Sequence, residues 1–552
     1  MTEPEIYRSP LPAPATGPPP VVAALRHAAA DPDRPAVVDG ATGQRLSRAE
    51  LAERSAAMAA GLAGRGVGRG DLVAVALPNL GVWPVVAMGV WRAGAAVVPV
   101  STRWTAEETA RVLALVRPRM AIASEASLPP LRGALEAAGS DAEVVVHGEA
   151  EGVTPLQRLL AAGAGDRFAE PRLAPGDLAV VPFSSGTGGL AKGVRLTHGN
   201  LAASSAQVAT GLGYGAGSVA LSAVPFFHVM GLGLSLCVPL SVGARIVTFP
   251  LPDTGRILEA VAEHRVTHAT VPLPMFAELA DDPRAERLDA SRLELLATAG
   301  AHVPAAVELR AGERLRCLAR QGYGMTEATT MISGPMGLGR PGEPGTVGWL
   351  AAGTEARLVD PEDGRDLPPG QPGELWVRGP QVMAGYHDDP DATAATITAD
   401  GWLRTGDLVT IRDDGQLVVQ DRLKELIKVD GAQVPPAELE LVLREHPSVR
   451  DAAVVGRPDA EAGEVPVAHV VLAGPATPEE LAAFVAPRVA AHKRLRGVRL
   501  VDGLPRMPSG KLLRRTLRDQ ERALPGPPAA GRPAAGVTPE GSPPPAAPTR
   551  RG

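Results

Sequence analysis

The chain carries the stretch Asp177-Leu-Ala-Val-Val-Pro-Phe183-Ser-Ser-Gly-Thr-Gly-Gly-Leu-Ala-Lys192-Gly-Val194. Its beginning, Asp177–Phe183, predicts a buried strand, and a loop rich in glycine and serine then leads to Lys192. Small residues let backbone N–H groups approach an anion, hydroxyl groups donate to it, and a lysine adds positive charge. The P-loop of kinases and ATPases needs Gly before and Ser or Thr after its lysine, but Ala191 and Gly193 stand here. We therefore predict a phosphate-binding loop of another kind, rather than a simple flexible turn.

Segments typical of helices and of strands alternate on both sides of this loop. Ser47–Arg65 predicts a helix with Ser47 as its N-cap and Glu50 three residues further on. Buried strands are predicted at Leu72–Leu77, Val97–Val100, Val219–Val224, Arg245–Phe249 and His268–Val271. This alternation favours an α/β fold with layered, mostly parallel sheets.

The character of the chain changes twice after this region. Short strands and turns from about 340 to 420 indicate a small β subdomain, with strands at Gly373–Val377, Gly406–Ile411 and Gln416–Val419. A small, mobile α+β unit is expected from there to about residue 520. We predict four parts: a Pro-rich segment over 1–20, a large domain over 21–421, a small C-terminal domain over 422–522, and a disordered tail rich in Pro, Ala and Gly over 523–552.

Composition excludes several classes of protein. The 552 residues carry a net charge of −6, whereas a general nucleic-acid binder is usually basic. Two cysteines cannot form a disulfide framework, and together with the lack of a secretory pattern they predict a cytoplasmic protein. The uncharged stretch Leu72–Trp91 is interrupted by Pro and Asn, and 196–244 by Gly, Ser and Pro, so we interpret both as buried core and not as membrane spans.

Lysine is rare in this chain, because only five of its 55 basic residues are lysine. A bias towards arginine is typical of a GC-rich genome. Lysine then tends to persist where a compact ammonium is needed. Each lysine is therefore a candidate site residue: Lys192, Lys424, Lys428, Lys493 and Lys511.

Four further motifs carry groups that suit nucleotide chemistry. Gln321-Gly-Tyr-Gly-Met-Thr-Glu327 offers a carboxylate for Mg²⁺ and an aromatic ring. Gly401-Trp-Leu-Arg-Thr-Gly-Asp407 ends in a carboxylate that could accept both hydroxyl groups of a ribose. The stretch from Asp421 to Glu440 holds two of the lysines, and Pro505-Arg-Met-Pro-Ser-Gly-Lys511 presents another on a tight turn.

Taken in this order and spacing, the five motifs resemble the adenylate-forming (AMP-dependent acyl-CoA synthetase) superfamily, from about residue 20 to 520. The nearest likeness is to the 4-coumarate–CoA ligase branch. It rests on Val224-Pro-Phe-Phe-His228-Val-Met-Gly, Gly379-Pro-Gln-Val-Met-Ala-Gly-Tyr386 and Glu425-Leu-Ile-Lys428. The resemblance implies an ATP-dependent acid–thiol ligase with ATP, Mg²⁺ and CoA as cofactors or co-substrates.

The resemblance also implies roles for particular residues. The loop over the ATP phosphates would comprise Ser184, Ser185, Gly186, Thr187, Gly188, Gly189 and Lys192. The adenine and acyl pocket would be lined by Gly300, Ala301, Gln321, Gly322, Tyr323 and Gly324, with His228 beside the acyl group. Thr326 would touch the α-phosphate, Glu327 and Thr187 would hold Mg²⁺, and Asp407 and Arg422 would hold the ribose. The small domain would contribute Lys424 at its hinge, Lys428, Gly431 and Gln433 in one orientation, and Lys511 in the other. No role is implied for Lys493.

Three positions depart from the branch. Gly188 stands where Thr is usual, and Asp430 and Leu251 stand near positions that are often basic beside the CoA channel. Two missing positive charges would weaken the grip on CoA by about 1 kcal/mol each. Arg245 could compensate for them.

These departures leave alternatives open. The main one is a stand-alone ligase that loads its acid onto a separate phosphopantetheinyl carrier protein. A luciferase would share the same adenylation machinery. An amino-acid substrate is disfavoured because no Asp lies near Val224–Val229 to pair with an amine. The expected acid is aromatic (cinnamate-like) or medium-chain, and the oligomeric state stays open.

Overall fold

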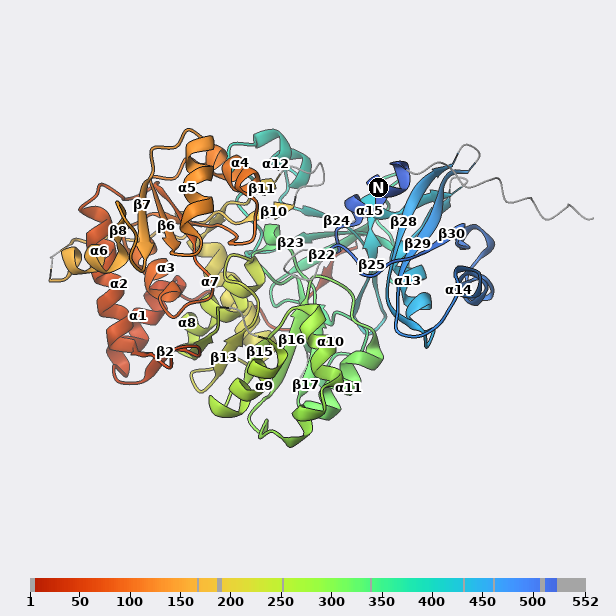
Figure 1. Ribbon diagram of the computed structural model, residues 1–552, viewed down its shortest axis with the longest axis horizontal. Helices are drawn as coiled ribbons and strands as arrows, with labels where there is room; N and C mark the ends of the chain where they lie inside the picture. Colours follow the sequence, from red (N-terminus) through yellow and green to blue (C-terminus); the bar gives the residue numbers. More distant parts are fainter. Residues whose placement is uncertain are drawn as a thin grey trace, which may run out of the picture.

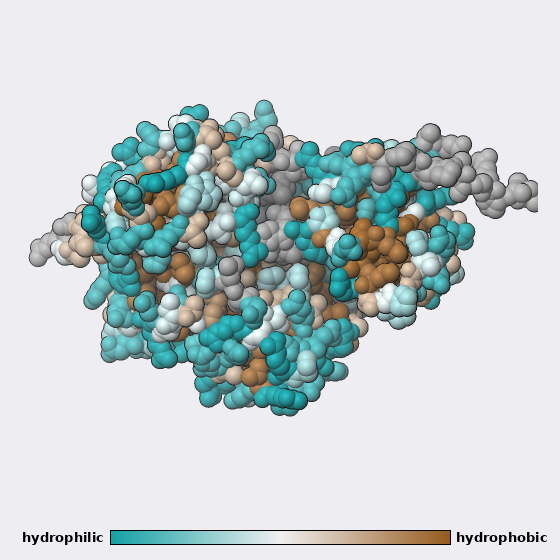
Figure 2. All heavy atoms as spheres, in the orientation of Figure 1, coloured by the Kyte–Doolittle hydropathy of each residue, from teal (hydrophilic) through white to brown (hydrophobic). Residues whose placement is uncertain are grey.

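The computed structural model describes residues 5–165, 168–185, 191–250, 253–337, 340–429, 432–459, 462–506 and 512–523. Within these ranges, two layered α/β regions and a β subdomain precede a smaller α+β unit that forms a separate lobe (Figure 1). The face drawn in Figure 2 is largely hydrophilic, with apolar atoms on both lobes that gather into a patch on the smaller, C-terminal one. The α/β class and the small C-terminal unit predicted from the sequence are confirmed.

The first large sheet has the strand order β12-β9-β5-β4-β6-β7-β8. Its strands are β4 (Leu72–Ala76), β5 (Ala96–Pro99), β6 (Met120–Ser124), β7 (Glu143–His147), β8 (Thr154–Pro155), β9 (Leu178–Val180) and β12 (Leu196–Thr197). All neighbours are parallel except β12 and β9. The helices in the same part of the chain are α2 (Arg48–Ala63), α3 (Trp83–Arg92), α4 (Ala106–Val116), α5 (Leu128–Ala137) and α6 (Leu156–Gly163).

Two predictions can be checked in this region. Ser47 caps α2 and forms a capping box with Glu50, as expected. The uncharged stretch Leu72–Trp91 forms the buried strand β4 and most of the buried helix α3. Among the described residues, no helix is both long enough and apolar enough to cross a membrane.

The second large sheet has the strand order β17-β16-β15-β13-β14-β2-β3, and only β3 runs antiparallel to its neighbour. Its strands are β2 (Pro35–Asp39), β3 (Arg45–Ser47), β13 (Val219–Ser222), β14 (Arg245–Thr248), β15 (His268–Thr270), β16 (Leu295–Ala299) and β17 (Leu318–Gly322). The other helices that precede the β subdomain are α1 (Pro20–Ala30), α7 (His198–Leu212), the π-helix Gly231–Cys237, α8 (Val238–Val242), α9 (Thr254–Glu263), α10 (Leu273–Asp281) and α11 (Ala305–Leu315).

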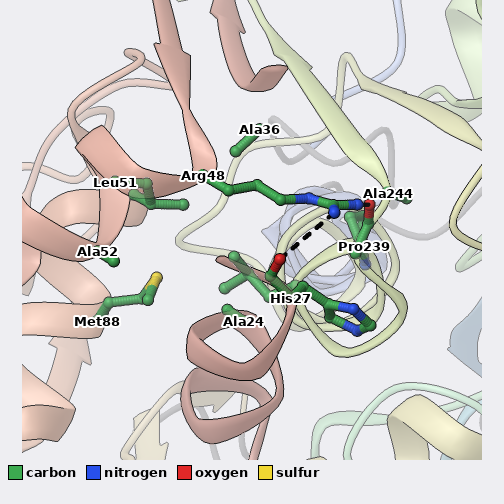
Figure 3. A pocket seen from close by; sticks show the side chains of 11 residues that line it. Ala24, His27, Ala36, Arg48, Leu51, Ala52, Met88, Pro239 and Ala244 are labelled. Carbon is green, nitrogen blue, oxygen red and sulfur yellow. Dashed lines mark hydrogen bonds between the residues drawn. The ribbon is translucent and has the colours of Figure 1, made fainter. Parts of the chain in front are cut away.

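A buried arginine joins α1, α2 and α8 at a small cavity (Figure 3). The Arg48 guanidinium donates to the carbonyl oxygens of Gly243, at 2.5 Å, and His27, at 3.5 Å. Both carbonyls lie at helix C-termini, where a positive charge is favourable. Burial lowers the pKa of Arg48, but the ordinary value is so high that the charge persists. This cavity therefore lies at a junction of helices in the large domain.

The β subdomain has the strand order β1-β22-β23-β24-β25. Its strands are β1 (Tyr7–Arg8), β22 (Glu355–Val359), β23 (Gly373–Arg378), β24 (Leu403–Ile411) and β25 (Leu417–Arg422), and helix α12 spans Pro390–Thr396. Short antiparallel pairs join β10 (Phe183–Ser185) to β11 (Ala191–Gly193), β18 (Ser333–Gly334) to β21 (Trp349–Leu350), and β19 (Met336–Gly337) to β20 (Arg340–Pro341). Strand β1 lies in the segment read from the sequence only as Pro-rich, and it pairs with a strand some 350 residues away.

The C-terminal unit is a sheet of β26 (Ile427–Val429), β27 (Ala432–Val434), β28 (Val449–Asp459), β29 (Gly463–Leu472) and β30 (Gly497–Leu500). Its helices are α13 (Pro436–Arg444), α14 (Pro478–Val485) and α15 (Arg514–Ala523). Strand β25 ends at Arg422, so the change of lobe follows the β subdomain directly. The division of the chain at 421 and 522 stays a prediction, and the predicted tail lies almost wholly outside the described residues.

Candidate active site

Three residues that are far apart in the sequence meet at the edge of the β subdomain. Asp407 on β24 lies opposite Arg422 on β25, and the two form an ion pair of 3.2 Å. The Tyr323 hydroxyl donates to the other oxygen of Asp407 at 2.6 Å. Burial, and then the charge of Asp407, raise the pKa of Tyr323 well above its usual value, so the phenol stays a donor. The structure therefore brings together the residues expected at the ribose and the adenine.

The turn after β17 carries Thr326 and Glu327. A short 3-10 helix spans Thr326–Ala328, and Thr329 and Thr330 follow with φ of 49° and 114°. A Cβ at Gly324 would lie 1.6 Å from the carbonyl oxygen of Thr330, so only glycine fits at this position. The turn places the largely buried Glu327 carboxylate within 2.9 Å of the Tyr386 hydroxyl, which donates to it.

Lys192 lies in the hairpin that flanks the predicted phosphate loop. Strands β10 and β11 pair Ser184 with Lys192. The Lys192 Nζ atom stands 4.7 Å from the centroid of the Tyr386 ring. Among the described residues, the buried Ser184 hydroxyl has no hydrogen-bond partner, which suits a group that would donate to a phosphate oxygen. The predicted loop residues Gly186, Thr187, Gly188 and Gly189, and the side chain of Ser185, lie outside the described part.

The loop after β16 carries Gly300 and Ala301. Gly300 has a φ of +92°, and a Cβ built there would meet nothing within 4 Å, so open space adjoins it. The buried Gln321 side chain both accepts from and donates to the backbone of Val303, at 2.9 and 3.0 Å. Its amide therefore holds this loop in place, a role that the motif alone did not reveal. Gly322 follows at the end of β17.

His228 follows β13 at the end of the second sheet. Its Nδ1 atom accepts a hydrogen bond of 3.2 Å from the backbone N–H of Met230. In the neutral ring this acceptor role leaves the proton on Nε2. The histidine can therefore offer an N–H donor.

The lysines of the small domain have different surroundings. Lys428 is exposed on β26 and pairs in register with Gln433 on β27. Lys424 is exposed in a turn directly after β25. Lys493 forms an ion pair of 2.6 Å with Glu438, which gives it a contact within the small domain. Lys511, Gly431 and Asp430 lie outside the described residues, and their predicted roles stay predictions.

Arg245, which was predicted as a possible compensation for the missing charges at the CoA channel, has a hydrogen-bond partner within the large domain. The Arg245 guanidinium donates to the carbonyl oxygen of His264, directly after helix α9. It therefore neutralises a helix C-terminus, and its pKa is lowered by burial and by neighbouring arginines. Leu251 lies outside the described residues.

The side chains of the candidate site can be compared with the ligands that Mg²⁺ usually has in proteins. The described residues contain no group of three or more His, Cys, Asp or Glu side chains that could hold a metal. Magnesium is usually bound through one or two carboxylates together with substrate phosphates, and not by an all-protein cage. The single carboxylate of Glu327 fits that pattern.

Comparison with known proteins places the chain in a family. The AMP-binding enzyme family matches residues 25–387, and the AMP-binding enzyme C-terminal domain matches 438–511. Over 506 residues the chain is 38% identical to 4-coumarate--CoA ligase-like 9 of Oryza sativa subsp. japonica, covering 88% of this chain and 90% of that protein. It is 35% identical to the 4-coumarate--CoA ligase of Pinus taeda, covering 88% and 92%.

Solved structures agree with this result. ATP-bound MatB from Rhodopseudomonas palustris superposes with a TM-score of 0.84 at 28% identity, covering 91% of this chain and 99% of that chain. A benzoate CoA ligase from Burkholderia xenovorans gives a TM-score of 0.82 at 28% identity, covering 90% and 99%. The chain therefore belongs to the AMP-binding enzyme family. It is an AMP-forming acyl-CoA synthetase, an ATP-dependent ligase that activates an acid as an acyl-AMP, as the motifs predicted.

Proposed function

We propose that this enzyme activates an aromatic or otherwise bulky, apolar acid, and that the residues predicted from the sequence carry the reaction. The observation that best supports these residue roles is that Tyr323, Asp407 and Arg422 meet. Glu327 lies in the turn that follows Tyr323. In this proposal Asp407 accepts the ribose hydroxyl groups, and Arg422 fixes its carboxylate.

The first half-reaction must bring a carboxylate to a polyanion, and repulsion between like charges opposes this approach. Lys511 would neutralise the carboxylate and the α-phosphate together, and Lys192 would offset charge on the leaving pyrophosphate. Thr326 would contact the α-phosphate. Mg²⁺, for which Glu327 and Thr187 are the proposed ligands, would supply further positive charge to the phosphates.

In the second half-reaction a thiol must reach the carbonyl carbon of the acyl-AMP, close to the place that Lys511 would occupy in the first half-reaction. A turn of the small domain about Lys424 would withdraw Lys511 and present Lys428 and Gln433 instead. Strand β25 ends at Arg422, only two residues before Lys424, and Lys424 is exposed. Both features support a pivot at Lys424.

The acid is inferred from the small residues Gly300, Ala301 and Gly322 and from the open space beside Gly300. An apolar pocket gains about 0.8 kcal/mol for each buried CH₂ group, so a short acid would gain little. His228 would lie beside the acyl group. In the names of the curated relatives the acid is 4-coumarate, and one solved neighbour is a benzoate CoA ligase, which supports an aromatic acid here.

A substrate panel tests this assignment. We expect cinnamates, benzoates or medium-chain acids to exceed acetate and propionate in kcat/KM. Acetate or propionate as the best substrate would refute the proposed acid class.

CoA is the acceptor that we propose, in a cytoplasmic setting. The second candidate, loading of a separate carrier protein, is favoured by the acidic Asp430 where a basic residue is often found. A single thioester assay that compares CoA with a phosphopantetheinyl carrier protein distinguishes the two. Faster transfer to the carrier would reverse our choice.

A further inference from the structure

The segment from Met383 to His387 lies between two parts of the site. Its backbone pairs with the strand that continues from Lys192. The N–H of Arg195 donates to Gly385 at 2.9 Å, the N–H of Ala384 to Arg195 at 3.0 Å, and the N–H of His387 to Gly193 at 2.8 Å. On its other side, the N–H of Met383 donates to the carbonyl of Glu327 at 2.9 Å. This segment therefore connects the phosphate-loop hairpin to the turn that carries Glu327.

The side chain of Tyr386 repeats this connection. Its hydroxyl donates to Glu327 Oε1 at 2.9 Å, and its ring lies 4.7 Å from Lys192 Nζ. Tyr386 is only 8% exposed. The hydroxyl is the donor in this contact, because an ionised carboxylate can only accept.

We propose that Tyr386 is a positioning residue, which orients the Glu327 carboxylate towards metal-bound ATP and seats Lys192 through its ring. This inference rests on the proposed role of Glu327 as the metal ligand. A hydrogen bond to one carboxylate oxygen fixes the plane of the group and directs the other oxygen. An ammonium over an aromatic face is attracted by the ring, which limits the positions that Lys192 samples before ATP arrives.

Two substitutions separate the two contacts. Tyr386→Phe removes the hydroxyl but keeps the ring, so it should affect Glu327 and leave Lys192 in place. Tyr386→Leu removes both. We expect Tyr386→Phe to weaken metal binding about tenfold, the range seen when a partner of a metal ligand is lost. Tyr386→Leu should in addition raise the KM for ATP, with the KM for the acid unchanged in both variants.

Metal binding can be measured without turnover. Electron paramagnetic resonance of Mn²⁺, titrated into the full-length protein with α,β-methylene ATP, reports its dissociation constant. Pyrophosphate–ATP exchange at increasing Mg²⁺ concentrations gives the matching half-saturation value. Tyr7→Phe is the matched control, because it removes a hydroxyl from β1 in the outer strand of the β subdomain. Its Mn²⁺ affinity should equal that of the wild type.

Glu327→Gln distinguishes failure of this proposal from failure of the proposed function. If Glu327→Gln weakens Mn²⁺ binding but Tyr386→Phe only lowers the melting temperature or kcat, Tyr386 is merely structural and the proposal is overturned. If neither variant changes Mn²⁺ binding, Glu327 is not the metal ligand, and both proposals fall. Weakened binding in both variants, with the tyrosine control unchanged, supports the inference.

Discussion

The phenol of Tyr323 donates a hydrogen bond of 2.6 Å to Asp407, a carboxylate that lies 84 residues further along the chain. The same carboxylate is paired with Arg422 from the adjacent strand. Both partners hold Asp407 in one orientation before any nucleotide binds. Preorganised acceptors of this kind lose less entropy on binding than mobile side chains do.

Tyr323→Phe should therefore weaken ATP binding without changing the acid site. A lost hydrogen bond to a charged group costs about 1.5 kcal/mol, so the KM for ATP should rise about tenfold. Steady-state kinetics with ATP and acid varied separately would check this. An equal rise in both KM values would contradict a specific role at Asp407.

Lys511→Ala should abolish acyl-adenylate formation and spare thioester formation from supplied acyl-AMP. The reason is that Lys511 is proposed to act only in the first domain orientation. The loss in pyrophosphate–ATP exchange should reach a factor of about 100 to 1,000, as when a single charge-stabilising group is removed. Lys428→Ala is the reciprocal variant and should impair the second half-reaction more. Equal losses in both half-reactions for Lys511→Ala would refute this division of roles.

Asp430→Lys should lower the KM for CoA. The nucleotide end of CoA is a polyanion, and one exposed positive charge contributes up to about 1 kcal/mol to the free energy of binding it. The effect should shrink as salt rises, because the screening length is only about 8 Å at physiological ionic strength. Adenylation should be nearly unchanged, and loading of a phosphopantetheinyl carrier, which lacks that nucleotide, should respond much less. An unchanged KM for CoA at low salt would show that Asp430 does not face the CoA phosphates.

Asp421→Asn should change how stability depends on pH. Burial raises the pKa of Asp421 to about 6, and its carboxylate accepts from the backbone N–H of Ala437 at the start of α13. The folded state therefore binds its proton more tightly than the unfolded state. The resulting stabilisation is complete below pH of about 4 and is lost as the pH rises through about 6. Denaturant titrations of Asp421→Asn between these pH values should lack this component, whereas an unchanged slope would place its origin in another group.

The sequence alone was sufficient to predict the family, the class of reaction and the layered α/β fold. Buried parallel strands read as continuous apolar runs, so β4 and β14 could be located closely from local pattern. The capping box of α2 is equally local, because Ser47 and Glu50 are only three residues apart. The motif from Gln321 to Glu327 is contiguous for a physical reason. It forms the end of β17 and one tight turn, so the side chains that the turn brings to the site come from a few consecutive residues.

Tertiary structure alone decided which of these groups meet. The β1 strand is too short to have a pattern of its own and exists only because β22 offers an edge. The amide of Gln321 is held by the backbone of Val303 in another loop, and its own motif does not report that contact. The contact of Tyr386 with Glu327 and Lys192 joins segments separated by 59 residues and more, and nothing in its local sequence reports such a contact. Local chemistry is set by neighbours in the chain, whereas the orientation of a carboxylate is set by whatever the fold packs against it.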